Sequence, residues 1–174
     1  MSERGLVRTG TVTDVPLLAA IELAAGRLFP ASRIPDPDHT YPVAELIRAA
    51  DEGLLFVVEV DGAVVGFATC SRSGERLHLD EVSVHPDQGR RGYGRALVLR
   101  VIEEARERKQ VGVSLTTFSD IAWNGPFYTA MGFLEMPESE QDATLREALA
   151  GERAFGMTNR IAMVFVIDAQ AGNE

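Results

Sequence analysis

The segment 88–97 places three glycines and three arginines within ten residues, namely Gly89, Arg90, Arg91, Gly92, Gly94 and Arg95. Glycine leaves backbone N–H groups unshielded, and arginine pairs readily with phosphate oxygens. At the start of a helix, N–H groups without an internal partner and the helix dipole both favour an anion. The segment therefore predicts an anion-binding turn that suits a pyrophosphate.

The elements on either side of this turn support that interpretation. Residues 77–85 read as a strand, and residues 92–107 read as a helix because apolar side chains such as Leu97 and Val101 recur at helical spacing. The turn therefore lies between a strand and the N-terminus of an amphipathic helix. The alternative is that this segment is only a glycine-rich turn with solvated arginines, without a binding role.

Two common nucleotide-binding motifs fit this turn poorly. A P-loop would need a Gly-Lys-Ser/Thr sequence, which is missing. A dinucleotide-binding fingerprint would need a third glycine where the chain has Leu97, and it would follow a different order of elements.

The rest of the chain alternates between strand and helix patterns. Strands are expected at 6–9, 54–60, 63–70, 111–118, 132–136 and 160–167, and helices at 43–51, within 124–131 and after Thr13 as N-cap. Asp61-Gly62 predicts a tight hairpin turn, and the segments 26–42 and 136–160 look irregular. This order indicates a mixed α/β sheet with helices on both faces.

The strand 77–85 changes the face of its apolar side chains. Leu77 and Leu79 have one parity, and Val82 and Val84 have the other. One extra residue at Asp80-Glu81, a β-bulge, would return both halves to the core and leave backbone groups for a ligand. A sheet buried on both faces would also explain the pattern.

The whole chain bounds the class of protein. Its 174 residues fit a single domain, 1–174, and its net charge of −9 argues against nucleic acid as a partner. Cys70 is the only cysteine, no apolar run reaches membrane-spanning length, and no signal peptide is visible. These features predict a cytoplasmic protein without a membrane partner.

Two motifs resemble those of the GNAT family of N-acetyltransferases. "VSVHPDQGRRGYGRAL" is similar to the family's acetyl-CoA-binding motif, and "FYTAMGF" is similar to a second motif in which a tyrosine precedes Gly-Phe. Tyr128, Gly132 and Phe133 match the second motif. The family's Gln or Arg position is occupied by Gly89, with Gln88 one residue early, which departs from the strict pattern.

The resemblance implies a fold and a cosubstrate. The fold is the acyl-CoA N-acyltransferase fold, a mixed and mostly antiparallel sheet of about seven strands with helices on both faces. Its two splayed central parallel strands would be 77–85 and 111–118 here. Acetyl-CoA would bind between them, with the backbone of Val82, Ser83 and Val84 on the pantetheine arm. Residues 89–95, Tyr93 included, would hold the pyrophosphate.

The resemblance also suggests catalytic roles. Tyr128 would assist the leaving thiolate, and Glu81 would accept the proton of the amine through water. Asp80, His78, Asp120 and water are the other candidate bases. Asn124 is assigned to the cofactor because the family has an asparagine nearby, although the matching position is Ile121. Asn124 could equally be a helix N-cap.

The expected function is acetyl transfer from acetyl-CoA to a primary amine of a small molecule or peptide, by direct attack. The alternative is a non-catalytic acyl-CoA-binding or regulatory module with the same fold. The acceptor would lie over the 26–42 segment and the ends of strand 111–118. No metal is expected, because the histidines lack ligand spacing, and a homodimer is left open.

Overall fold

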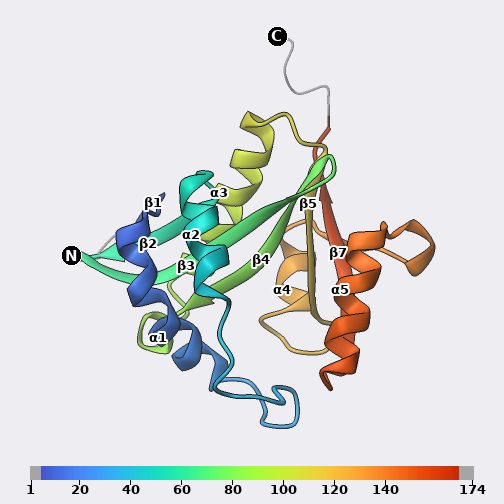
Figure 1. Cartoon of the computed structure of the whole chain (residues 1–174), viewed down its shortest axis with the longest axis horizontal. Helices are drawn as coiled ribbons and strands as arrows, with labels where there is room; N and C mark the ends of the chain where they lie inside the picture. The colour runs from blue at the N-terminus through green and yellow to red at the C-terminus, as the bar shows by residue number, and fades with distance from the viewer. Residues whose placement is uncertain (1–4, 169–174) are drawn as a thin grey trace. The chain divides into compact units, whose positions relative to one another are not determined.

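The computed structural model describes residues 5–168 (Figure 1). Its seven-stranded sheet has the order β1-β2-β3-β4-β5-β7-β6. The strands are β1 (Leu6–Thr9), β2 (Leu55–Val60), β3 (Ala63–Ser73), β4 (Arg76–Val84), β5 (Gly112–Phe118), β6 (Leu134–Glu135) and β7 (Arg160–Val166). The helices are α1 (Val15–Gly26), α2 (Val43–Asp51), α3 (Tyr93–Glu107), α4 (Gly125–Ala130) and α5 (Ala143–Ala154).

The chain forms two compact units. Among the described residues, the first comprises 5–71 and 79–101, and the second comprises 72–78 and 102–168. Strand β4 and helix α3 each contribute residues to both units. The prediction of a single domain, 1–174, stays a prediction, and its first four and last six residues lie outside the described part.

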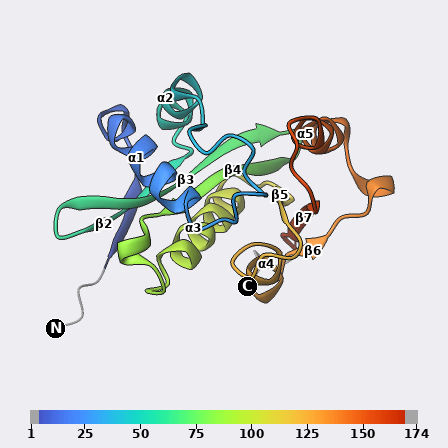
Figure 2. The same ribbon diagram turned by 90° about the horizontal axis from the view of Figure 1, so that it is seen from below.

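The first unit is built around the β2–β3 hairpin. Leu55, Phe56, Val57 and Val58 are all fully buried, so this strand is covered on both faces. Figure 2 shows α1 and α2 on one face of the hairpin and the start of α3 on the other. Asp61 and Gly62 both have positive φ angles, 50° and 79°, which confirms the predicted tight turn.

The start of α1 differs from the prediction. Thr13 is not the N-cap, because a 3₁₀ turn over Val12–Asp14 precedes the helix and Asp14 occupies the N-cap position. The Asp14 carboxylate accepts the Thr11 N–H at 2.8 Å and pairs with Arg8 at 2.9 Å. The Arg8 guanidinium holds the pKa of Asp14 below its usual range, so this carboxylate stays charged and ties β1 to the turn.

The second unit contains the parallel pair of strands. β4 pairs with β5 in parallel through Arg76–Gly112, Leu77–Val113 and His78–Ser114. Both strands continue beyond the last of these pairs. The bulge expected at Asp80-Glu81 stays a prediction, as does the splay of the two strands.

Helix α5 was not predicted, and it corrects the expectation that 136–160 is irregular. Asp142 is its N-cap, with a side chain that accepts the Leu145 N–H at 2.9 Å. Leu145 and Leu149 pack with Met136 and Ala162 in a small buried cluster. Figure 2 shows α5 on one side of β5 and β7 and α4 on the other. The segment therefore adds a helix between the last two strands.

Candidate active site

The Gly-Arg turn has the geometry expected of an anion site. A 3₁₀ turn over Pro86–Gln88 follows β4, and α3 begins at Tyr93. Arg90 and Gly92 have positive φ angles of 59° and 81°. Glycine adopts a φ of +81° without the strain that a Cβ would bring, so Gly92 suits the backbone path itself. This path turns the chain directly into the first turn of α3.

The first turn of α3 supplies the donors. The first helical hydrogen bond runs from the Ala96 N–H to the Gly92 carbonyl at 3.0 Å. The N–H groups of Tyr93, Gly94 and Arg95 come before it, where a helix offers no internal acceptor. A Cβ on Gly94 would meet only Val84 Cγ2, at 4.0 Å, so the space beside these N–H groups is open. The turn thus fits a phosphate group.

Two residues of the turn play a different part from the one expected. The Gly89 N–H donates to the Pro86 carbonyl at 3.0 Å, so it closes the 3₁₀ turn. The Tyr93 ring is buried and packs so closely on Gly5 that a Cβ there would collide with it. Neither the Gly89 N–H nor the Tyr93 ring is therefore aimed at a ligand, although the Tyr93 N–H belongs to the first turn of α3.

The arginines lie at the surface of the turn. Arg90, Arg91 and Arg95 are all exposed. Exposed guanidinium groups near a helix N-terminus add positive charge that reinforces the helix dipole. Their contribution to anion binding is screened by salt, whereas the backbone donors are fixed in place.

Glu81 is held by a neighbour on its own strand. The buried Ser83 hydroxyl donates to Glu81 Oε1 at 2.8 Å. This hydrogen bond fixes the orientation of the carboxylate on β4. Val82 and Val84 are half-buried on the same strand, and Val84 lies toward Gly94 of α3. The predicted cofactor strand and the predicted pyrophosphate turn are therefore neighbours within the first unit.

Tyr128 lies on α4, in the second unit. Its ring makes edge contacts with Phe127 and Phe133, with centroids 5.1 Å and 5.5 Å apart. Its carbonyl accepts the Phe133 N–H at 3.0 Å, which joins the two ends of the "FYTAMGF" motif. Gly125 is needed below it, because a Cβ would lie 3.0 Å from the carbonyls of Phe118 and Ser119. These contacts position the phenol.

Asn124 is fixed by β5. Its Oδ1 accepts the Thr117 hydroxyl at 2.9 Å, and its side chain makes no capping bond to α4. The residue stands at the N-cap position of α4, but the cap interaction considered from the sequence is missing. The side chain instead connects the α4 turn to a buried strand residue, a partner that the sequence did not indicate.

The other candidate bases are engaged in their own contacts. His78 Nδ1 lies 3.0 Å from the Ser114 hydroxyl, across the parallel strand pair. Asp120 accepts a hydrogen bond from the Asn159 side chain at 2.9 Å. The burial of Tyr41 raises its pKa, and the charge of Asp80 raises it further. Asp80 is thus an electrostatic neighbour of the segment between α1 and α2.

Glu22 on α1 is a residue that the sequence reasoning missed. Both of its carboxylate oxygens lie 3.0 Å from the Tyr41 backbone nitrogen. Burial raises the pKa of Glu22, against the opposing effects of this N–H and of His39. The available signal was composition, because Glu22 is the one charged residue of an otherwise apolar helix.

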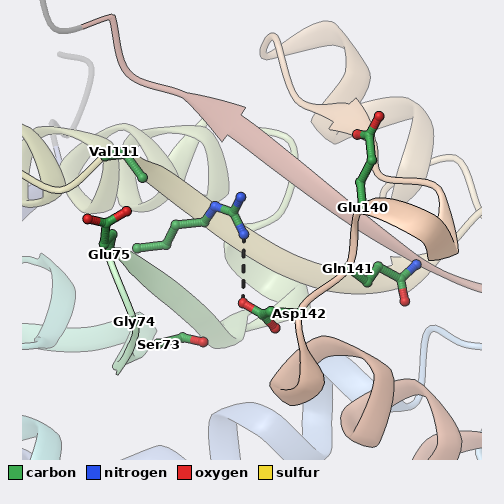
Figure 3. Close-up of a pocket in the computed structure, with 8 residues that line it drawn as sticks. Ser73, Gly74, Glu75, Val111, Glu140, Gln141 and Asp142 are labelled. Atoms are coloured by element: carbon green, nitrogen blue, oxygen red, sulfur yellow. Dashed lines mark ion pairs between the residues drawn. The ribbon is translucent and has the colours of Figure 1, made fainter.

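A separate pocket lies in the second unit (Figure 3). It is bounded by the β3–β4 turn and the start of α5, and has a volume of about 280 Å³. Arg76 and Asp142 pair loosely within it at 3.8 Å. The lining of this pocket includes the first residue of β4, whereas the Gly-Arg turn follows the last residue of that strand.

The described part of the chain shows neither a metal-binding cluster nor a membrane-spanning helix. Among residues 5–168, no group of three or more histidine, cysteine, aspartate or glutamate side chains could hold a metal ion. None of the helices in that part of the chain is long and apolar enough to cross a membrane.

Comparisons with known proteins agree on one family. A family model described as the acetyltransferase (GNAT) family matches residues 20–133. An uncharacterised N-acetyltransferase of Methanocaldococcus jannaschii is 35% identical over 92 residues, which are 49% of this chain and 41% of that relative. The chain thus matches less than half the length of that relative.

Solved structures share the fold at low identity. The PaiA N-acetyltransferase of Thermoplasma acidophilum, in complex with coenzyme A, has a TM-score of 0.71 and 12% identity, covering 94% of this chain and 99% of that one. The ribosomal-protein-S18-alanine N-acetyltransferase of Escherichia coli has a TM-score of 0.68 and 22% identity, covering 98% and 99%. These likenesses confirm the predicted fold class.

Proposed function

Because the chain belongs to the acetyltransferase (GNAT) family, we propose that it transfers the acetyl group of acetyl-CoA to a primary amine by direct attack. The observation that carries this proposal is the turn into α3. Its left-handed Gly92 and the N–H groups of the first turn, with open space beside Gly94, fit a pyrophosphate. We assign this role to the backbone of 92–95, with Arg90, Arg91 and Arg95 adding charge.

The amine must lose a proton before it can attack. An alkyl amine has a pKa of about 10.4, so reaching the neutral form at pH 7 costs about 3.4 pKa units, or roughly 4.6 kcal/mol. We propose that Glu81, oriented by Ser83, accepts this proton directly or through water. Asp80, His78 and Asp120 remain the other candidates.

The thiolate that leaves must also be stabilised. The amine nitrogen bonds to the thioester carbon, the carbon–sulfur bond breaks, and the sulfur leaves with the electron pair. The nitrogen loses its second proton in this step, and that proton neutralises the thiolate, so that CoA leaves as a thiol. Tyr128 would donate a hydrogen bond to this thiolate. A full proton transfer from a phenol with a pKa near 10 to a thiolate near 8.5 is uphill by about 1.5 units. The phenol therefore assists departure without becoming an anion.

The acceptor side is proposed to include the segment between α1 and α2. This segment carries Asp36, Asp38 and His39, and Asp80 is an electrostatic neighbour of its Tyr41. Carboxylates in this region would favour a cationic amine over an anionic acceptor. The single cysteine, Cys70, is buried and forms no disulfide, which fits a reducing compartment, so we place the reaction in the cytoplasm.

Release of free thiol from acetyl-CoA, measured across a panel of small amines and peptide N-termini, tests the proposal. We expect amine-dependent thiol release with at least one acceptor, and an acetylated product by mass spectrometry. Tight acetyl-CoA binding without turnover on any amine would instead support the non-catalytic acyl-CoA-binding module.

A further inference from the structure

The segment between α1 and α2, residues 27–42, is fastened to α1 at its far end. Tyr41 lies nineteen residues after Glu22, and its backbone N–H points to both oxygens of the Glu22 carboxylate, each at 3.0 Å. A hydrogen bond to an ionised acceptor is stronger than one between neutral groups. The contact therefore closes a long connection onto the helix from which it started.

Two backbone hydrogen bonds within this segment are local. The Arg33 N–H donates to the Pro30 carbonyl at 2.8 Å, and the His39 N–H donates to the Asp36 carbonyl at 3.2 Å. Such turns shape the segment over three residues, but they do not attach it to a neighbouring element. The Glu22–Tyr41 contact does attach it, just before α2 begins at Val43.

The side chain of Tyr41 reinforces this attachment. The ring is half-buried, and burial raises the pKa of its phenol. The charges of Asp80 on β4 and Glu45 on α2 act in the same direction. Tyr41 thus interacts with three elements of the first unit. Its backbone N–H contacts α1, and its phenol interacts electrostatically with charged residues on α2 and on β4, the strand that carries Glu81.

Burial of the Glu22 carboxylate affects both its pKa and the free energy of unfolding. Burial raises its pKa above the value in the unfolded chain, while the Tyr41 N–H and His39 oppose the shift. The folded state then holds the proton to higher pH, so ionised Glu22 lowers the free energy of unfolding above its folded pKa. That loss disappears as the pH falls below the unfolded value.

We infer that Glu22 is a positioning residue that clamps the 27–42 segment onto α1, through the Tyr41 N–H, and so holds in place the part of the acceptor side that this segment forms. This inference rests on the proposed function for the role of the segment, but the clamp itself does not. It predicts that loss of Glu22 loosens the segment and weakens acceptor binding, while acetyl-CoA binding at the Gly-Arg turn is unchanged.

Limited trypsin digestion of the folded protein tests the clamp directly, because the segment contains Arg27 and Arg33. We expect Glu22→Ala to raise the cleavage rate after Arg33 by about tenfold, as the loss of a charge-assisted hydrogen bond would. Glu22→Gln keeps one acceptor oxygen and should give a smaller increase. An unchanged rate in Glu22→Ala would overturn the clamp, whatever reaction the protein catalyses.

Two control variants separate the clamp from general effects. Glu103→Ala removes an exposed glutamate of α3 and should leave cleavage after Arg33 unchanged. Tyr41→Phe keeps the backbone N–H and removes only the hydroxyl, so it should preserve most of the protection. If Glu103→Ala loosens the segment as much as Glu22→Ala, the effect is global and the inference fails.

Steady-state kinetics with an amine from the thiol-release panel test whether Glu22 affects acceptor binding. We expect Glu22→Ala and Glu22→Gln to raise KM for the amine by several-fold more than KM for acetyl-CoA. Equal changes in the two constants would overturn the positioning role even if the clamp is real. Absence of turnover in the unmodified protein would overturn the proposed function, and the digestion would still decide the clamp.

Discussion

Single residues decide whether this site can do chemistry, and Tyr128 is the clearest case. Its ring is held between Phe127 and Phe133, so the phenol is positioned by packing. Tyr128→Phe keeps that packing and removes only the donor. We expect kcat to fall by about 10²-fold or more, the usual contribution of a positioned acid, while the Kd for acetyl-CoA stays the same in a calorimetric titration.

A matched variant checks that the loss comes from the hydroxyl. Phe127→Leu disturbs the ring contact but leaves the phenol in place, so it should cost much less in kcat than Tyr128→Phe. If Tyr128→Phe retains full kcat, the phenol has no part in thiolate departure.

The sequence predicted candidate site residues but not their partners. Tyr128 followed from the second motif and Glu81 from its place on the predicted cofactor strand, and the structure shows what each of them contacts. Asn124 was weighed as a helix cap, yet its side chain accepts from Thr117, seven residues earlier in the chain. Glu22 was missed because its partner, the Tyr41 N–H, is a backbone group with no signature in the sequence. Side-chain partners depend on tertiary contacts, which residue spacing does not report.

Among the elements, the Gly-Arg turn gives the sharpest prediction. A Cβ on Gly94 would touch only Val84 Cγ2, at 4.0 Å, and Gly94 lies in the first turn of α3. Gly94→Val should therefore fold, because valine is no worse in a helix than glycine. Its branched side chain would cover the first-turn N–H groups, so we expect acetyl-CoA to bind at least about tenfold more weakly, a loss of about 1.4 kcal/mol.

Gly94→Ala is the matched control, since a single Cβ fits beside Val84 and should leave acetyl-CoA binding nearly unchanged. Gly92 is a poorer test, because its φ of +81° strains any other residue and would confuse folding with binding. Arg90→Gly removes an exposed charge without strain and should weaken binding only modestly. Normal acetyl-CoA affinity in Gly94→Val would contradict the assignment of the turn.

Helices and strands were predictable from the sequence only where their local sequence signals are strong. The hairpin at Asp61-Gly62 and helix α3 were predictable because turn chemistry and apolar spacing agree there. Helix α5 was missed because only Leu145 and Leu149 are buried along it and Gly151 lies inside it. Its start was nonetheless marked by Asp142, a favourable N-cap residue. A short helix with two buried side chains depends on the strands it packs against, so its local pattern is weak.

At the level of the whole molecule, the sequence does not show which segments of the chain form each compact unit. Each compact unit combines stretches that are distant in sequence, and both β4 and α3 pass from one unit to the other. The family resemblance supplied the parallel pairing of strands 77–85 and 111–118, which spacing alone could not. It could not supply the acceptor, because the residues of the 27–42 segment carry no motif.

The sharing of β4 and α3 predicts that the chain unfolds as one domain. Calorimetry should show a single transition, with the calorimetric enthalpy equal to the van't Hoff enthalpy. Acetyl-CoA at 100 times its Kd should stabilise the folded state by about 2.7 kcal/mol, which for a chain of this size raises Tm by about 5–10 °C. At the same acetyl-CoA concentration, Gly94→Val should lose about half of this shift or more and keep the single transition. Two separate transitions, of which acetyl-CoA moves only one, would show that the units fold independently.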